Sequence, residues 1–323
     1  MRSYVLQRLA QFLIVFLAVT FGVMVLLRLG LDAPGDPARS MLGGFASQDL
    51  IDATNARYHL TSNYFVQYFH WLKGLLVDQD LGYSASNSMA VSTMIGRRIV
   101  TTLLLGFYAI GSGLLLAVPL AVAQAYRRDR WFDKSSSFVT FIFVSVPSIV
   151  IAVFLKWLFV DTFSLFPRIA DKVYPWQDPW EHAVNFALPT LTLALPAAAV
   201  FSRLLRGELV LTLQSDFIGL ARAKGMSPRR ILWRHALRNS AFTCLTSVGV
   251  QLGVVLGGAI IAETFFDLDG MGLLLITAVL TNDLFTVQSI TALLVITVVV
   301  ANLAIDLLYS AIDPRVRLAS ALQ

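Results

Sequence analysis

Long apolar runs, separated by short charged segments, dominate the chain. Six of these runs contain no Asp, Glu, Lys or Arg, and they cover residues 9–27, 99–126, 135–155, 183–202, 239–262 and 284–305. A helix needs about 20 mostly apolar residues to cross the hydrocarbon core of a bilayer. The pattern therefore predicts six transmembrane helices.

Four prolines fall inside these runs: Pro119, Pro147, Pro189 and Pro196. Proline is tolerated in a membrane helix where neighbouring helices or Ser and Thr side chains satisfy the freed backbone groups. The prolines therefore predict kinks. A kink at the wall of a pathway and an ordinary packing kink are equally compatible with the sequence.

The composition supports a membrane protein and limits its chemistry. Of the 323 residues 57% are hydrophobic and 14% are charged, whereas soluble domains carry about 25% charged residues. The single cysteine, Cys244, excludes a disulfide framework and a cysteine-based metal site. The four histidines lie far apart in the sequence without ligand spacing, so no metal site is expected.

The first apolar run could be read as a signal peptide, because Arg2 and Arg8 resemble its basic start. The run is longer than the usual apolar region of about 7–15 residues, and no small-x-small cleavage site follows before Arg28. Residues 1–30 are therefore expected to stay as the first transmembrane helix.

Basic residues gather in alternate connections between the apolar runs. The N-terminus, the loops 127–134 and 203–238, and the C-terminal tail together hold 16 of the 25 Lys and Arg residues. Basic loops stay on the cytoplasmic side of a membrane. Both termini and these two loops are therefore expected in the cytoplasm, and the net charge of +5 reflects topology rather than nucleic-acid binding.

The outer segment 31–96 carries an amphipathic helix pattern. Apolar side chains recur every three or four residues at Tyr64, Phe65, Tyr68, Phe69, Leu72, Leu75 and Leu76. Gln67 and Lys73 are expected to face away from this stripe. The helix is predicted to lie on the membrane surface or to cap the outer mouth.

A second outer loop, 161–182, contains Tyr174, Trp176 and Trp180. Such residues are typical of the aromatic belt at a membrane interface. Binding of a sugar or a peptide by the same side chains is the alternative.

The cytoplasmic loop 206–238 contains signals for two short helices. Ser215 or Asp216 can cap the first helix, and Gly225 occupies the place where a left-handed residue ends it. Ser227 can cap the second helix, expected over 229–238, and Pro228 suits its first position.

Helices this short need a surface to pack against, and three surfaces are compatible with the loop. Ala221 and Ala223 leave room for close approach of a partner protein, with Arg222, Lys224, Arg229 and Arg230 around them. A basic helix on anionic lipid is the second reading. A DNA-binding helix–turn–helix is the third, but attachment to membrane helices at both ends argues against it.

The loop resembles the conserved cytoplasmic loop of bacterial ABC importer permeases of the oligopeptide, dipeptide and nickel group. The match runs through Asp216, the segment 221–225 (ARAKG) and the segment 234–239 (RHALRN). Further matches in family order are GDP at 35–37, DLGYS at 80–84, SVPS at 145–148, GAIIAETFF at 258–266, GMGL at 270–273 and DPRVR at 313–317. The long outer segment resembles the "B" type of the two paired permeases.

Two positions depart from the family pattern. Gly219 and Leu220 precede Ala221 where the glutamate of the EAA motif would stand, as is usual for the peptide-type subset. Asp269-Gly270 replaces the usual Pro-Gly pair, which affects the local turn beside a possible outer gate formed by Glu263, Asp267 and Gly270.

The resemblance implies a non-catalytic translocation subunit. Its implied partners are a second homologous permease, two ATPase subunits that bind ATP and Mg, an extracellular or lipid-anchored substrate-binding protein and membrane lipid, but no nucleic acid. The expected ATPase-coupling residues are Asp216, Ala221, Arg222, Ala223, Lys224, Gly225, Ser227, Pro228 and Arg229. The chain contains no GxxxxGKS or GxxxxGKT loop, so no ATP or other cofactor is expected in it.

The alternative from another class is a stand-alone, proton-coupled secondary transporter. Such a protein would need paired charges within the membrane and would often contain an inverted repeat. The sequence shows neither. Asp306 in the sixth run is an intramembrane carboxylate, but its position near the cytoplasmic end favours a structural role.

The sequence thus predicts an all-α integral protein of the bacterial cell (inner) membrane that imports peptides or similar small solutes. Its expected parts are the first transmembrane helix (1–30), a largely helical outer segment (31–96), a membrane core of helices two to six with the coupling loop (97–312) and a cytoplasmic tail (313–323).

Overall fold

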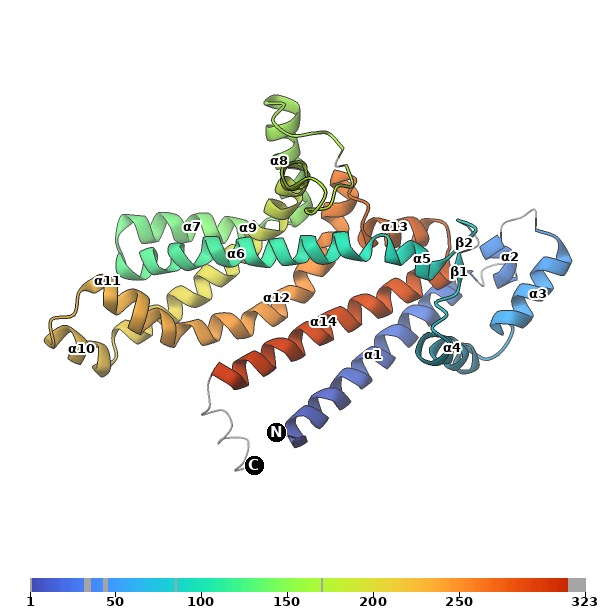
Figure 1. Ribbon diagram of the computed structural model, residues 1–323, viewed down its shortest axis with the longest axis horizontal. Coiled ribbons are helices and arrows are strands. Elements are labelled where there is room, and N and C mark those ends of the chain that lie inside the picture. The colour runs from blue at the N-terminus through green and yellow to red at the C-terminus, as the bar shows by residue number, and fades with distance from the viewer. Residues whose placement is uncertain (1, 32–35, 43–45, 85, 170, 313–323) are drawn as a thin grey trace. The chain divides into compact units, whose positions relative to one another are not determined.

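The computed structural model describes residues 2–31, 36–42, 46–84, 86–169 and 171–312, which are mostly helical (Figure 1). Five helical segments among these residues are long and apolar enough to cross a membrane: Ala10–Gly30, Val91–Tyr126, Pro179–Leu213, Cys244–Phe266 and Leu284–Ile305. A bent pair, Trp131–Ser145 and Ser148–Thr162, makes a sixth candidate. The all-α membrane fold is therefore confirmed. The predicted tail 313–323 lies outside the described residues.

The chain forms two compact units, which we call the first and the second unit. The first unit comprises Met1–Thr101 and Asp269–Val299, and the second comprises Thr102–Leu268 and Val300–Gln323. Helices α6 (Ile99–Tyr126) and α14 (Leu284–Ile312) contribute residues to both units.

The first unit combines α1 (Arg2–Leu31) with the segment 31–96, which the sequence predicts to lie outside the membrane. Its further elements are α2 (Pro37–Leu42), α3 (Gln48–Tyr58), α4 (Tyr64–Lys73), the π-helix η1 (Gly74–Asp78), β1 (Tyr83–Ser84), β2 (Met89–Ala90), α5 (Val91–Gly96) and α13 (Met271–Leu280). Strands β1 and β2 pair antiparallel, with Tyr83 opposite Ala90. Asn63 begins α4, because its side chain accepts from the Phe65 amide at 3.1 Å.

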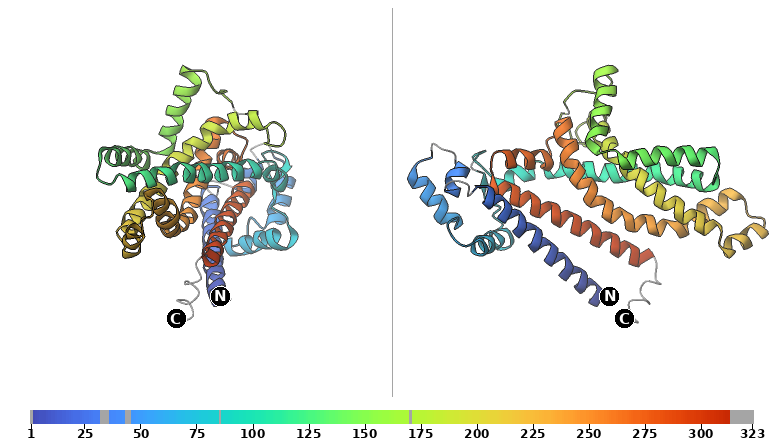
Figure 2. Two further views of the ribbon diagram at one scale, coloured as in Figure 1. Left: turned by 60° about the vertical axis from the view of Figure 1, so that its left-hand side comes forward. Right: turned by 180° about the vertical axis from the view of Figure 1, so that it is seen from behind.

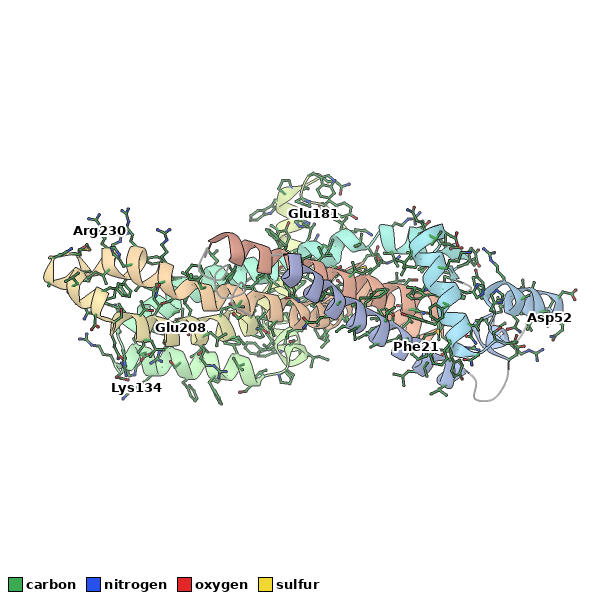
Figure 3. The ribbon with its side chains drawn as sticks, turned by 90° about the horizontal axis from the view of Figure 1, so that it is seen from below. Phe21, Asp52, Lys134, Glu181, Glu208 and Arg230 are labelled. Carbon is green, nitrogen blue, oxygen red and sulfur yellow. The ribbon has the colours of Figure 1, made fainter. Side chains whose placement is uncertain are left out.

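Helix α4 packs against α1 through aromatic side chains. The Tyr68 hydroxyl lies 2.7 Å from Thr20 Oγ1, and both residues are buried. Phe65 stacks on Phe21 of α1 with ring centroids 5.0 Å apart; Phe21 is labelled in Figure 3. These contacts fix α4 to α1.

The predicted orientation of α4 is partly wrong. Gln67 is buried rather than facing away, and its Nε2 donates to the carbonyls of Leu60 and Ser62 at 3.1 and 2.7 Å. Phe69, which the stripe included, is instead 65% exposed. A buried amide is stable here because the carbonyls of the turn before α4 satisfy it.

The second unit is built around one long buried helix. Its further elements are α7 (Trp131–Ser145), α8 (Ser148–Lys156), the π-helix η2 (Trp157–Thr162), α9 (Pro179–Leu213), α10 (Asp216–Ala223), α11 (Pro228–Arg230), the π-helix η3 (Ile231–Ala236) and α12 (Leu237–Phe266). Helix α9 contacts α7, α8 and α12, and it carries more buried residues than any other helix of the unit. Asp178 begins α9 by accepting from the amides of Trp180 and Glu181 at 2.9 and 3.0 Å.

Only one of the four prolines breaks its helix. Pro147 separates α7 from α8, which meet at an angle of 105° (Figure 2). Val146 before it is extended, as the residue before a proline prefers. Pro119 lies inside a continuous α6, and Pro189 and Pro196 lie inside a continuous α9. The run 135–155 is therefore a bent pair rather than one straight span.

The contact between α12 and α9 depends on a glycine. A Cβ at Gly258 would stand 2.9 Å from Leu193 Cδ2, whereas a Cβ at the neighbouring Gly257 would meet nothing within 4 Å. Leu193 is buried in the core cluster of the second unit. The two adjacent glycines therefore form a matched pair for mutation.

We expect Gly258→Ala to lower the free energy of unfolding by about 1–2 kcal/mol, since overpacking outweighs the gain in helix propensity. Gly257→Ala should be neutral or stabilising by up to about 1 kcal/mol. Thermal unfolding of the purified protein in detergent measures both. Equal effects of the two substitutions would contradict the packing described for Gly258.

Candidate functional site: the Asp216–Arg230 loop

The loop after α9 begins with α10, whose C-terminal end has a well-defined cap. Gly225 has φ of +74°, and its amide donates to the Arg222 carbonyl at 2.9 Å. The Met226 amide donates to the Ala221 carbonyl at 3.2 Å. This pair of bonds is the Schellman cap, which needs a left-handed residue and favours glycine. The predicted left-handed helix cap at Gly225 is confirmed.

The N-terminal caps use backbone rather than side-chain oxygens. The Ser215 carbonyl accepts from the amides of Ile218 and Gly219, whereas its hydroxyl donates to the Thr212 carbonyl at 2.5 Å. Ser227 has the extended backbone of a cap residue, and its side chain accepts no capping bond. Ser215 and Ser227 occupy the predicted cap positions, but neither side chain accepts a capping hydrogen bond.

The second predicted helix, 229–238, is not a separate short helix. The chain remains helical from Pro228 through α11 and η3 into α12, which ends at Phe266. The prediction was wrong because no proline interrupts this stretch after Pro228. The loop therefore consists of one short helix, α10, attached by a tight turn to the start of a membrane helix.

Helix α10 has a buried and an exposed face. Ile218 and Ala221 are buried against Ile231, and Leu213 and Met226 complete this small cluster. The predicted exposure of Ala221 at a partner-facing surface is therefore wrong. The two buried residues lie three positions apart on the helix, so they form one inward stripe.

The opposite side of α10, which we call the exposed face, carries two large apolar side chains. Phe217 is 47% exposed and Leu220 is 59% exposed, and Gly219, Ala223 and Lys224 are exposed with them. The sequence prediction missed Phe217 and Leu220. Their spacing of three residues on a charged helix was the available signal.

Four basic side chains of α10 and the turn after it are exposed. Arg222, Lys224, Arg229 and Arg230 are all exposed, and the Arg222 Nη2 donates to the Leu213 carbonyl at 3.4 Å. In Figure 3, Arg230 and Lys134 lie at the same end of the second unit. A cavity of about 420 Å³ between the 127–130 turn and α10 is lined by Tyr126, Arg128, Gln214, Arg222, Met226 and Pro228, among others. Two predicted cytoplasmic loops thus lie together.

An ion pair with a buried carboxylate ties α7 to α9 near this end. Arg206 Nε and Nη2 each donate to the Asp133 carboxylate at 2.6 Å, and the Asp133 side chain is 3% exposed. Asp133 also accepts from the Asp129 amide at 2.9 Å, which fixes the turn after α6. The paired geometry is the strong, bidentate form of an arginine–carboxylate contact.

The residues of the possible outer gate lie in the sequence at the end of α12 and the start of α13. Glu263 is buried and accepts from Thr102 Oγ1 at 2.6 Å within the second unit. Asp267 is exposed, has φ of +57° and ends α12. Gly270 begins α13 in the first unit, where Asp269 pairs with Arg98 at 2.5 Å. Asp269, which stands where the family usually has proline, thus forms a salt bridge to Arg98 at the turn before α13.

The other candidate chemistry gives no further site. Within the described residues no group of three or more His, Cys, Asp or Glu could hold a metal ion. His59 and His70, which are apart in sequence, stack with ring centroids 3.8 Å apart. Asp306 lies in α14, and its side chain is outside the described part of the structure.

Two family models match the chain over almost its whole length. The model described as "Binding-protein-dependent transport system inner membrane component" matches residues 88–318, and the model of the N-terminal part of such membrane components matches residues 1–106. The chain belongs to this family. It is a membrane component of a binding-protein-dependent transport system, and the resemblance to ABC importer permeases is confirmed.

The permease is similar to several named proteins over 98% of its length. It is 34% identical to a putative peptide transport system permease protein of Brucella abortus, covering 99% of that protein. It is 30% identical to a dipeptide transport system permease protein of Alkalihalophilus pseudofirmus, covering 100% of it. It is 31% identical to a glutathione transport system permease protein of Salmonella choleraesuis, covering 99% of it.

Solved structures share the fold at lower identity. A chain of the inward-facing MetNI methionine ABC transporter matches with a TM-score of 0.57 and 18% identity, covering 68% of the permease and 96% of that chain. This likeness supports the multi-pass helical architecture.

Gly225 gives a direct test of the cap. We expect Gly225→Ala in the permease to cost about 1 kcal/mol, because a Cβ disfavours the left-handed conformation, whereas Gly225→Asn should cost less. No atom lies within 4 Å of a Cβ at this position, so backbone strain alone is measured. Amide hydrogen exchange in α10 reports the change. Equal exchange in the wild type and in the Ala variant would contradict a strained cap.

Proposed function

We propose that the permease is the non-catalytic translocation subunit of an ABC importer that carries peptides or similar small solutes into the cell. The names of the relatives favour peptide cargo, since they are described as peptide, dipeptide and glutathione permeases. ATP hydrolysis is assigned to separate subunits that bind ATP and Mg, because the sequence has no phosphate-binding glycine loop.

The exposed face of α10 is the proposed ATPase contact. A short helix presents Phe217 and Leu220 outward, and apolar residues of this size on a charged helix favour burial against a partner protein. Arg222, Lys224 and Arg229 surround it and would orient the partner by charge. Ala223 and Gly219 permit close approach, while Asp216, Gly225, Ser227 and Pro228 shape the helix and its turn.

Movement of α10 would reach the membrane through rigid contacts. The cluster of Ile218, Ala221 and Ile231 joins α10 to η3, which continues into α12. The Asp133–Arg206 pair joins α9, which precedes α10, to α7. Displacement of α10 by the ATPase would therefore move α7, α9 and α12 together.

The remaining partners and the orientation follow from the same proposal. A second homologous permease, two ATPase subunits and an external binding protein complete the importer, with both termini and α10 on the cytoplasmic side. The distribution of basic residues favours this orientation. Glu263, Asp267 and Gly270 would form the outer gate, because they lie where α12 ends and α13 begins.

The experiment is uptake of a labelled dipeptide into proteoliposomes that contain the permease and its partners. The proposal predicts uptake that needs ATP inside and the binding protein outside. Uptake by the permease alone, driven by a proton gradient, would instead establish the secondary transporter.

A further inference from the structure

A small cavity lies entirely within the first unit, apart from α10 and its turn. It has a volume of about 220 Å³, and α1, α3, α4, η1 and α14 line it. Tyr58 and Phe285 form an aromatic wall, with ring centroids 4.2 Å apart. Drug-sized ligand sites measure about 300–1,000 Å³, so this cavity suits a smaller molecule.

Two residues that line this cavity each carry a buried hydrogen-bond donor without an acceptor in the described part of the chain. Trp71 is 8% exposed and Gln288 is 1% exposed. Within the described residues, neither Trp71 Nε1 nor Gln288 Nε2 has a hydrogen-bond partner. Leaving a buried donor unsatisfied costs about 1–3 kcal/mol, and proteins satisfy the great majority of such groups.

Gln67 shows how the same unit treats an amide that needs no ligand. Its Nε2 is also buried beside the cavity, but it donates to two backbone carbonyls. Trp71 and Gln288 therefore differ from an ordinary buried polar side chain. Among the residues that the structure describes, both donors lack the same kind of partner, an acceptor oxygen.

The exposed part of the lining adds charges of both signs. Arg57 and His70 are exposed on the basic side, and Asp78 and Asp80 are exposed on the acidic side. Asp80 already accepts from the Gly82 amide at 2.8 Å, which leaves Asp78 as the carboxylate better placed for a ligand cation. The cavity thus combines buried neutral donors with an exposed, charged rim.

We propose that this cavity binds the carboxylate of a small zwitterion, an amino acid or the C-terminal end of a short peptide. Trp71 Nε1 and Gln288 Nε2 donate to the carboxylate, Arg57 favours its negative charge, and Asp78 receives the ammonium group. Hydrogen bonds from these donors to a charged oxygen are stronger than bonds between neutral groups. Because several helices line the cavity, a bound ligand also stabilises the first unit.

All residues of the site lie in the first unit, whereas the proposed ATPase contact lies in the second unit. The site therefore does not depend on which cargo the importer carries. The test measures equilibrium binding to the full-length permease in nanodiscs, with three probes: glycylglycine, acetate and ethylamine. Glycylglycine and acetate carry the carboxylate, and ethylamine carries only the ammonium group. The site predicts binding of the first two and none of ethylamine.

The decisive variants remove one donor and keep the shape. Trp71→Phe and Gln288→Leu should each weaken carboxylate binding at least ~10-fold, the loss of one hydrogen bond to a charged group. Trp180→Phe is the matched control, because Trp180 is 79% exposed and lies outside the cavity. Thermal unfolding identifies any variant that fails to fold. If one of Trp71→Phe and Gln288→Leu fails to fold, carboxylate binding by the other variant tests the site.

Three results would overturn the site. Absence of carboxylate binding to the wild type would mean that the cavity holds only water. Unchanged binding in both Trp71→Phe and Gln288→Leu would place the carboxylate elsewhere. Binding of ethylamine as tight as that of acetate would exclude recognition through the two buried donors.

Discussion

Replacing Leu220 by Asp is expected to abolish the association of the permease with its ATPase subunits. Leu220 is 59% exposed in the free permease and sits on the exposed face of α10 beside Phe217. In the proposed complex this side chain is buried, so Leu220→Asp would bury an unpaired carboxylate and remove apolar contact. We expect affinity for the ATPase to fall at least ~30-fold, which is about 2 kcal/mol.

Co-purification of the ATPase with the permease, and ATP hydrolysis stimulated by cargo, are the measurements. Leu165→Asp is the matched control, because Leu165 is 64% exposed in the loop after η2 and carries the same side chain. The control should leave both measurements unchanged. If Leu220→Asp still retains its ATPase subunits, the exposed face of α10 is not their contact.

Removing Arg206 is expected to be the most destabilising single change near the loop. Arg206→Ala leaves the Asp133 carboxylate, which is 3% exposed, without its bidentate partner. Loss of one member of a buried ion pair costs about 3–5 kcal/mol, because the remaining charge stays buried. We expect a fall of this size in the unfolding free energy, measured in mixed micelles, together with loosening of α7 from α9.

The double variant Asp133→Asn/Arg206→Met separates buried charge from packing. It should recover most of the lost stability, since both charges are gone and the Asn oxygen can still accept from the Asp129 amide. Arg168→Ala is the control for a surface pair, as Arg168 is 81% exposed and lies 3.5 Å from Asp161. It should change stability by less than about 1 kcal/mol. No recovery in the double variant would contradict the role of the buried charge.

Membrane spans and helix caps were predictable because they depend on local properties. Apolar length identified the spans, and Gly225 was assigned to a left-handed cap because few other residues adopt that conformation readily. The order and spacing of short motifs along the chain also indicated the family. These features follow from the residue types alone.

Features that depend on tertiary contacts were not predictable. The inward position of Ala221 follows from its contact with Ile231, which lies beyond the turn. Gln67 is buried because the folded turn before α4 aims the carbonyls of Leu60 and Ser62 at its amide. Asp133 pairs with Arg206, which lies 73 positions away in the sequence. The cavity of Trp71 and Gln288 combines helices from both ends of the chain. Only the folded arrangement brings these residues together.

Cross-linking from α10 tests the central claim most directly. Cys244 is buried, so Leu220→Cys introduces an accessible thiol at the exposed face, and Leu165→Cys does the same at a distant loop. After labelling with a photoactivatable maleimide in the assembled importer, the Leu220→Cys permease should cross-link to an ATPase subunit and the Leu165→Cys permease should not. Absence of an ATPase cross-link from position 220, or equal cross-linking from position 165, would contradict the account.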